Sequence, residues 1–473
     1  MKNYFLIILL CSYSLISVGQ TNTSQAIDSL FTEWDNPGVP GCALGIVKDG
    51  KLIYTKGYGI ADLEHNIEIK PSSVFYIASV SKQFVTFCIL LLEEQGKLNL
   101  DDKIQKFLPD FPEYDAPLTI RHFIHHMSGV RDFLTLMYLK GRSYLDNIDK
   151  NEVYDLIKRQ KELNFTPGEK YLYSNSCYFM LAMIVEKASG QSIKEFAHEN
   201  IFQPLGMKNT LFYDDNTDLI KNRVFSYEKK NEGEEFNNLI MRYDLVGSGG
   251  VYSNIEDLFL WDQNFYDNKL GRGGQGIINK MHEEGILNNG ESCGYAFALN
   301  IGKYKGLRTV SHGGSLAGYR SQLLRFPEED FSVILLANRS DANTRAKAFK
   351  VADVLLKDKF IEESLEEENQ NAESNNLNTK EKFSPGQLPE ETDLEKYTGN
   401  FYSEELDATY QIFTEDEELK LKAANYGAQK LRKPDSDTFA SDFGLLRFCR
   451  LNGSIKGFEL DAGRVTNLKF ERK

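Results

Sequence analysis

The chain has 473 residues, of which 41% are hydrophobic and 26% are charged, and its formal net charge is -14. A single core rarely grows beyond about 300 residues, so this length predicts one large domain and a smaller companion. The composition is that of a folded protein, and the negative charge argues against nucleic acid as a partner because two polyanions repel each other.

The first 20 residues have the pattern of a signal peptide. Lys2 supplies a positive charge, residues 4–18 form an apolar stretch that is short for a membrane span, and small or polar residues follow from Gly19. We therefore expect export to the periplasm or the extracellular space. An uncleaved membrane anchor is the alternative interpretation.

The next segment predicts a strand hairpin followed by a buried helix. Residues 42–61 hold two apolar runs on either side of Asp49-Gly50, a dipeptide typical of a tight hairpin turn. From about Ser79 to Gln95 the apolar residues recur at helical spacing, and Gly96 ends the pattern. A strand pair is thus expected to lead into a helix that begins near Ser79.

Residues 100–290 have mostly helical and loop-like patterns, and strand character returns after them. Early strands, central helices and late strands predict an α/β fold of the α+β kind, with one antiparallel sheet flanked by helices and an all-helical subdomain. Helices are expected at 119–127, 152–160, 178–188 and 345–356, and strands at 295–301, 318–326 and 331–337.

The composition changes at residues 359–393, which are acidic, contain Pro and Gly, and have few large apolar side chains, as is typical of a linker. Residues 394–473 alternate between polar and apolar side chains and contain turn signals at Asn452-Gly453 and at 461–463. They predict a small C-terminal all-β module that resembles a barrel. The expected organisation is a signal peptide at 1–20, a main domain at 24–358, the linker and this module.

The cysteines and histidines predict neither disulfides nor a metal site. The six cysteines are scattered, mostly inside apolar runs, which is typical of buried free thiols. His122 and His126 lie four apart on a predicted helix, but no adjacent glutamate and no third ligand accompany them. Residues 247–250 look like a phosphate loop without its Lys-Ser/Thr, and we expect them to line or support a cleft. No cofactor is expected.

Ser79 and Lys82 open the predicted helix, and their spacing of three residues places the hydroxyl and the amine on one helix face. A serine hydroxyl becomes a good nucleophile when a nearby base takes its proton, and a lysine can be that base when its surroundings favour the neutral amine. Ser226 and Lys229 match the same pattern but lie in a polar, charged run. Taken alone, Ser79 and Lys82 would also fit a helix cap followed by a solvated lysine.

Two further segments supply groups suited to the same chemistry. Tyr173 and Asn175 follow a Pro-Gly turn and would point the same way on an extended loop, where the phenol shares proton transfer and the amide holds a substrate. His312 would face the same cleft, followed by Gly313 and Gly314, which let the backbone approach a ligand closely. An N–H near Ser315 would join that of Ser79 in stabilising an oxyanion.

The order Ser-x-x-Lys, Tyr-x-Asn, His-Gly-Gly resembles the serine β-lactamase and penicillin-binding protein superfamily, most closely its class C and serine-esterase branch. The similarity covers about residues 27–358. The supporting segments are Phe75-Tyr76-Ile77-Ala78-Ser79, Gly96-Lys97-Leu98, Leu118-Thr119-Ile120-Arg121-His122 and Pro204-Leu205-Gly206-Met207.

This resemblance implies a serine hydrolase in which Ser79 is acylated, Lys82 and Tyr173 handle its proton, and Asn175 orients the substrate. His312 departs from the Lys-Thr-Gly common among true β-lactamases, and a histidine is charged only part of the time near neutral pH. The departure weakens the cation that would hold a β-lactam carboxylate. It favours peptidase or esterase activity on D-amino-acid peptides or esters.

Two alternatives to this interpretation are a true β-lactamase and a non-catalytic penicillin receptor or envelope scaffold, which would be acylated without turnover. Steady hydrolysis of an ester or amide would distinguish the enzyme from the receptor. The expected partner is a small-molecule or peptide substrate, and no integral membrane domain is expected once the signal peptide is removed. The sequence determines neither the natural substrate nor the oligomeric state.

Overall fold

A computed structural model of the chain describes residues 23–361 and 394–473, apart from 232, 234, 424 and 436. The chain forms two compact units, each assembled from separate segments. The predicted signal peptide and residues 362–393 of the predicted linker lie outside the described residues. In described residues, the first unit comprises 23–94, 191–283 and 294–361, and the second comprises 95–190, 284–293 and 394–473.

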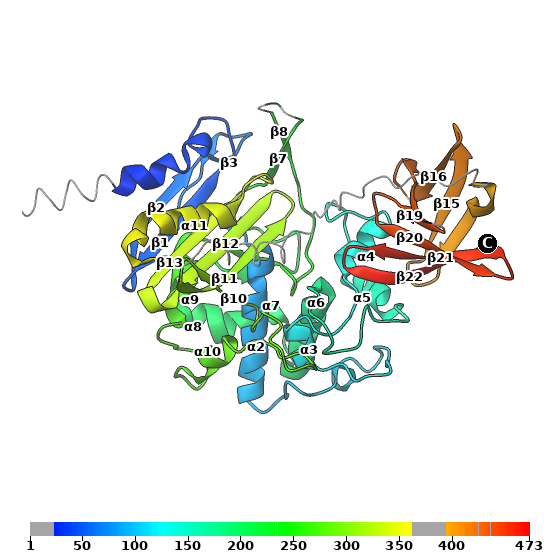
Figure 1. The fold of residues 1–473 in the computed structure, drawn as a ribbon. Coiled ribbons are helices and arrows are strands. Elements are labelled where there is room, and N and C mark those ends of the chain that lie inside the picture. The colour runs from blue at the N-terminus through cyan, green and yellow to red at the C-terminus, as the bar shows by residue number, and fades with distance from the viewer. Residues whose placement is uncertain (1–22, 232, 234, 362–393, 424, 436) are drawn as a thin grey trace, which may run out of the picture. The chain divides into compact units, whose positions relative to one another are not determined.

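A six-stranded antiparallel sheet is the centre of the first unit (Figure 1). Its strand order is β10-β11-β12-β13-β1-β2, so the early and late strands of this unit complete one sheet, as predicted. The hairpin turn at Asp49 and Gly50 is also confirmed, and both residues have a positive φ. The strands are β1 (Cys42–Lys48), β2 (Lys51–Tyr58), β10 (Asn300–Tyr304), β11 (Leu307–Leu316), β12 (Tyr319–Phe326) and β13 (Phe331–Ala337).

Helices cover both faces of this sheet. On one face, Leu44 of β1 packs in a cluster with Val351 of α11 (Thr344–Leu355). On the other face, a Cβ added at Gly45 would lie 2.4 Å from a methyl carbon of Ile255, at the start of α9 (Ile255–Asn264). Glycine at this position therefore lets α9 approach β1 closely. Because both faces are covered, the first six residues of β1 are all buried.

Apart from the helix α2 (Lys82–Glu94), the remaining elements of the first unit are short. This helix is preceded by a 3-10 turn, η2 (Ala78–Ser81), which packs against β11 and β12. The others are η1 (Thr32–Trp34), β3 (Ile60–Asp62), β4 (Ile67–Glu68), β5 (Phe75–Tyr76), α7 (Ile193–Ala197), η4 (His198–Phe202), α8 (Gln203–Leu205), β6 (Leu211–Phe212), β7 (Tyr227–Lys229), β8 (Phe236–Asn238), β9 (Val251–Ser253), α10 (Gly276–Met281), η5 (Pro327–Glu329) and η6 (Lys357–Lys359).

The second unit begins with a helical subdomain. Asp132 and Asp149 each accept a hydrogen bond from a backbone N–H of the helix that follows, which satisfies donors that have no partner within the helix. Gly190, with φ of 79°, ends the longest of these helices. The elements are η3 (Ile104–Lys106), α3 (Ile120–Ile124), α4 (Phe133–Leu139), α5 (Lys150–Lys158) and α6 (Asn175–Ser189).

The C-terminal module belongs to the same unit and is a nine-stranded antiparallel sheet, β17-β16-β15-β14-β22-β21-β20-β19-β18, that forms a nearly closed barrel (Figure 1). The predicted all-β character is confirmed: in β15, Tyr410 and Ile412 are buried, as the alternating pattern indicates. Its elements are η8 (Leu394–Tyr397), β14 (Gly399–Ser403), β15 (Ala408–Glu415), β16 (Glu418–Ala423), β17 (Gln429–Lys430), β18 (Arg432–Asp435), β19 (Thr438–Ala440), β20 (Leu445–Leu451), β21 (Ser454–Ala462) and β22 (Val465–Arg472).

Three local expectations were wrong. The strand expected at 295–301 begins at Asn300, because Ala298 has a φ of 58° that interrupts an extended backbone. Asn175 does not lie on an extended segment but is the first residue of α6. Cys449 is exposed and not buried, whereas Cys42, Cys88 and Cys177 are buried free thiols.

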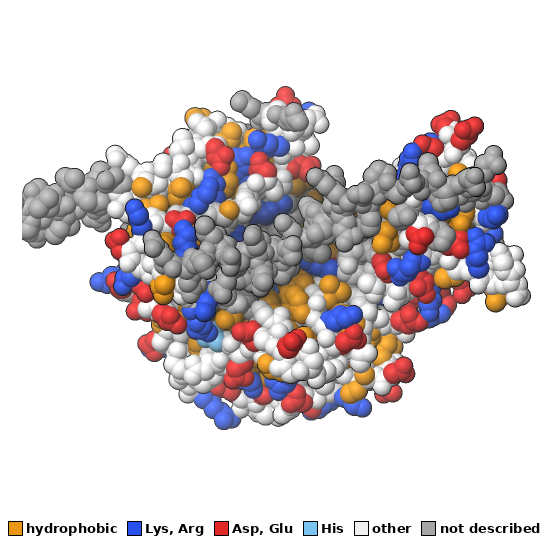
Figure 2. Space-filling model, in the orientation of Figure 1, with side chains coloured by type: hydrophobic (Ala, Val, Ile, Leu, Met, Phe, Trp, Pro, Cys, Tyr) orange, Lys and Arg blue, Asp and Glu red, His pale blue; other side chains and the backbone are white. Residues whose placement is uncertain are grey.

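Acidic and basic side chains are interspersed on the face of the molecule shown in Figure 2. Within the described residues, no helix combines the length and the apolar character needed to cross a bilayer.

Candidate active site

Ser79 in the 3-10 turn η2 and Lys82, the first residue of α2, form a hydrogen-bonded pair. The Lys82 amino group donates to the Ser79 hydroxyl oxygen over 3.1 Å and to the backbone oxygen of Ser248 over 2.5 Å. Lys82 is fully buried, whereas Ser79 is partly exposed. A buried amine that contacts a solvent-accessible hydroxyl is the arrangement that nucleophilic activation requires.

The backbone around Ser79 has an unusual conformation. Ala78 has a φ of 47°, in the left-handed region that costs a residue with a side chain about 1 kcal/mol or more. Tyr76 of β5 helps to hold the neighbouring segment, because its hydroxyl accepts a hydrogen bond from the N–H of Gly250. Residues 247–250 were expected to line or support a cleft. In the structure, the backbone oxygen of Ser248 accepts a hydrogen bond from Lys82.

Strand β11 brings the predicted glycine segment to Ser79. A Cβ added at Gly314 would lie 2.3 Å from the backbone oxygen of Ile77 and 3.0 Å from the backbone nitrogen of Ser79. No side chain fits there, so the backbones of β11 and η2 can approach each other only because this residue is glycine. The next residue, Ser315, is exposed.

His312, two residues before Gly314 on β11, is buried and held on both ring nitrogens. Its Nδ1–H donates to the Gly313 carbonyl over 2.6 Å, and Nε2 lies 2.9 Å from the Tyr295 hydroxyl, which donates to it. Burial first, and the charge of Lys82 second, lower the pKa of His312 to about 3. The imidazole is therefore neutral at physiological pH. The sequence predicted a histidine that is charged part of the time, so the structure removes the positive charge at this position more completely than expected. Tyr295 was not identified from the sequence.

Tyr173 and Asn175 belong to the second unit, where groups from distant parts of the chain hold them. The Asp132 carboxylate accepts from the backbone N–H of Asn175 over 2.6 Å and from its side-chain amide over 2.8 Å. The Tyr173 ring centroid lies 4.1 Å from that of His126, whose Nδ1 accepts from the N–H of Ser174. The Arg464 guanidinium carbon lies 4.7 Å from the same Tyr173 ring centroid.

None of these three supporting residues was assigned a role in the site from the sequence. In the sequence, His126 was considered only as a metal ligand. His122 instead completes a capping box at the start of α3 with Thr119. Among the described residues, no three His, Cys, Asp or Glu side chains form a group that could hold a metal ion.

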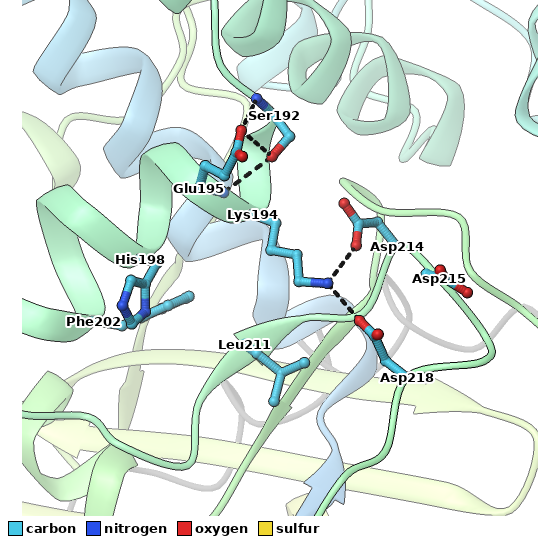
Figure 3. Close-up of a pocket in the computed structure, with 9 residues that line it drawn as sticks. All are labelled: Ser192, Lys194, Glu195, His198, Phe202, Leu211, Asp214, Asp215 and Asp218. Carbon is cyan, nitrogen blue, oxygen red and sulfur yellow. Dashed lines mark hydrogen bonds and ion pairs between the residues drawn. The ribbon is translucent and has the colours of Figure 1, made fainter.

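A separate hollow of about 590 Å³ lies in the first unit, around α7 (Figure 3). Two of its four acidic side chains pair with a cation, since Lys194 bridges Asp214 at 3.0 Å and Asp218 at 2.6 Å. The predicted site residues are not among the described residues that line it. These are Ser192, Lys194, Glu195, His198, Phe202, Leu211, Asp214, Asp215 and Asp218.

The first unit therefore combines a serine hydroxyl, a buried lysine and a closely packed glycine strand, which together define a serine hydrolase of the acyl-enzyme type. The family model described as Beta-lactamase matches residues 27–356. The chain belongs to the Beta-lactamase family, which confirms the predicted resemblance and the predicted serine hydrolase.

Curated relatives include a penicillin-binding protein and D-aminopeptidases. Penicillin-binding protein 4* of Bacillus subtilis (strain 168) is 33% identical over 328 residues, which cover 65% of this chain and 70% of that protein. A D-aminopeptidase of Brucella anthropi is 30% identical over 321 residues, 67% of this chain and 59% of the relative. The chain thus matches little more than half of the length of that D-aminopeptidase.

Solved structures share the fold. The octameric penicillin-binding protein homologue from Pyrococcus abyssi aligns with a TM-score of 0.64 at 22% identity, over 96% of this chain and 99% of that one. The D-amino acid amidase from Ochrobactrum anthropi SV3, complexed with L-phenylalanine amide, aligns with a TM-score of 0.62 at 20% identity, over 71% and 99%. The first of these alignments extends over nearly the whole chain, C-terminal module included.

Proposed function

We propose that the protein hydrolyses an amide or ester bond next to a D-amino acid, through an acyl-enzyme on Ser79. The observation that carries this proposal is the buried Lys82 amine, 3.1 Å from the Ser79 hydroxyl oxygen. An alcohol in contact with a desolvated amine can lose its proton as it attacks a carbonyl carbon.

The reaction has two steps. Ser79 attacks the carbonyl, its proton passes to Lys82 and Tyr173, and the leaving amine or alcohol departs with a proton. The backbone N–H groups of Ser79 and Ser315 stabilise the oxyanion, and Asn175 orients the substrate. A water molecule then attacks the acyl-enzyme, and the same groups return the proton to Ser79.

The neutral His312 supports a peptidase or esterase over an efficient β-lactamase. Its buried imidazole, with a pKa of about 3, supplies no permanent positive charge for the carboxylate of a β-lactam. We propose that it instead shapes the binding side of β11 together with Gly313 and Gly314. The D-aminopeptidase relatives support a D-amino-acid amide or short peptide as the substrate class.

The proposal is tested by steady-state hydrolysis with the wild-type protein and with Ser79→Ala. We expect turnover of D-alanine p-nitroanilide or of p-nitrophenyl acetate by the wild type, and loss of at least about 10³-fold in Ser79→Ala. A single labelling event per chain without turnover would instead indicate a receptor. Faster turnover of nitrocefin than of every ester and amide would indicate a true β-lactamase.

We also propose that residues 1–20 are a signal peptide, that residues 24–358 are the hydrolase domain, and that the protein works in the periplasm or outside the cell. The short apolar stretch after Lys2 supports export. The mass of the mature protein from its native host tests this: a mature N-terminus near residue 21 is expected. An intact N-terminus would contradict cleavage.

A further inference from the structure

The turn between β21 and β22 carries Arg464 from the C-terminal module to the loop that holds Tyr173. The guanidinium carbon lies 4.7 Å from the Tyr173 ring centroid, and Nη1 lies 3.7 Å from an oxygen of Asp132. The backbone of Arg464 is also fixed, because its carbonyl accepts from the side-chain amide of Asn164 over 2.9 Å. Both ends of this residue therefore contact the helical subdomain.

The module that carries Arg464 is anchored by a second, fully buried arginine. Arg131, next to Asp132 in the chain, forms an ion pair of 2.8 Å with Glu405 and donates to the backbone oxygens of Thr466 and Asn467. Its side chain is 0% exposed and that of Glu405 is 4% exposed. Thr466 and Asn467 follow Arg464 closely, so this anchor restrains the turn that places the guanidinium.

The charged and titratable groups around the Tyr173 loop are of both signs. Asp132 is the anion, but its Oδ2 already accepts two hydrogen bonds from Asn175, and Oδ1 accepts from the N–H of Thr135. Arg464 is the cation that contacts the ring, and its side chain is only 17% exposed. Further titratable groups are His126 against the ring, the exposed ion pair of Glu169 and Lys170 and the phenol of Tyr171 on the same loop, and Cys293 near Tyr171.

We propose that Arg464 is a positioning residue that acts through Tyr173: it orients the phenol and stabilises its phenolate, so that the C-terminal module completes the reaction centre. A positive charge within about 4–6 Å favours the anionic form of an acid. Arginine keeps that charge at every working pH, which the neutral His312 cannot do. This role rests on the proposed function of Ser79 and Tyr173.

The proton balance of the step defines what Arg464 must do. The Ser79 oxygen bonds to the carbonyl carbon and loses its proton, which passes through Lys82 to the phenolate oxygen of Tyr173. The carbonyl carbon then breaks its bond to the leaving group, which takes the proton from the Tyr173 phenol and regenerates the phenolate. Activity therefore requires the phenolate at the start, and kcat/KM should rise with pH as that form becomes populated.

The experiment measures kcat/KM against pH for the full-length wild type, Arg464→Gln and Arg464→Lys, with p-nitrophenyl acetate as substrate. We expect the rising limb of Arg464→Gln to move upward by about one pH unit, with an activity loss of about 10-fold below the limb. Arg464→Lys keeps the charge and should restore most of the wild-type profile. Arg450→Gln is the matched control, since Arg450 pairs with Asp437 inside the same module.

The outcomes separate the two proposals. If the wild type is inactive on esters and amides, the proposed function fails, and the role of Arg464 fails with it. If the wild type is active and the folded Arg464→Gln has the same limb, the role of Arg464 alone is wrong. If Arg464→Gln does not fold, the pH profile of kcat/KM for Arg464→Lys tests the proposal instead. A rising limb that lies about one pH unit above that of the wild type, although the charge is kept, would overturn the electrostatic role of Arg464.

Discussion

The groups proposed for catalysis in the first and in the second unit are held in different ways. Ser79 and Lys82 are three residues apart, and one helical turn brings their side chains together. Tyr173 depends on contacts from His126 and from Arg464, which is contributed by another module of the second unit. A four-residue motif is thus enough to bring Ser79 and Lys82 together. The surroundings of Tyr173, in contrast, form only when the whole second unit is folded.

The largest effect is expected where the local pair is broken. Lys82→Ala should lower the rate of acylation of Ser79 by about 10³-fold, because the base that takes the serine proton is lost. Labelling with a fluorophosphonate under single-turnover conditions measures this rate. Lys229→Ala is the matched control, since Lys229 stands in the other Ser-x-x-Lys match and is 46% exposed. Equal labelling rates in Lys82→Ala and the wild type would show that Lys82 is not the base.

Arg131→Met removes the buried ion pair with Glu405 that joins the C-terminal module to the helical subdomain. This change leaves the Glu405 carboxylate buried without its cation, which should lower the free energy of unfolding by about 3–5 kcal/mol. Chemical denaturation measures the change. The control is Arg159→Met, since Arg159 pairs with Asp407 across the same two regions but both side chains are nearly half exposed, and a loss below about 1 kcal/mol is expected. Equal losses in the two variants would mean that the buried pair does not anchor the module.

A smaller effect should follow from filling the space beside Ser79. In Gly314→Ala the new methyl group would meet the Ile77 carbonyl at 2.3 Å, so β11 must move away from η2. A displacement of about 1 Å at a reacting group lowers kcat by about 100-fold. Gly276→Ala, at the start of α10, has no atom within 4 Å of the added Cβ and should keep its activity. The idea fails if the two variants have the same kcat.

The smallest expected effect concerns His312. Its pKa is about 3 in the folded protein and about 6.5 when unfolded, so between these values only the unfolded state binds the proton. Stability should therefore fall as the pH drops from about 6.5 toward 3. His312→Gln should flatten that slope by up to about 1.4 kcal/mol per pH unit, measured by chemical denaturation at several pH values. Identical slopes would contradict a buried neutral imidazole; His282, whose pKa is lowered to about 4, affects both proteins alike.

Sequence patterns predicted the hairpin, the helix after Ser79 and the barrel-like module because each depends on neighbouring residues. The strand β11 was missed, since His-Gly-Gly-Ser lacks the β-branched side chains typical of strands and pairs through its register with β12. The buried segment at 295–299 was mistaken for a strand because its apolar side chains do not reveal the positive φ of Ala298. Asp132 and Arg464 could not be linked to Tyr173, since only tertiary packing brings them together.

The most direct measurement is to react the wild-type protein with a fluorophosphonate and to locate the adduct by peptide mass spectrometry. A hydroxyl activated by Lys82 should take up one label per chain, on Ser79, and Ser79→Ala should remain unlabelled. An adduct on a different side chain, or the same uptake by Ser79→Ala, would refute Ser79 as the nucleophile.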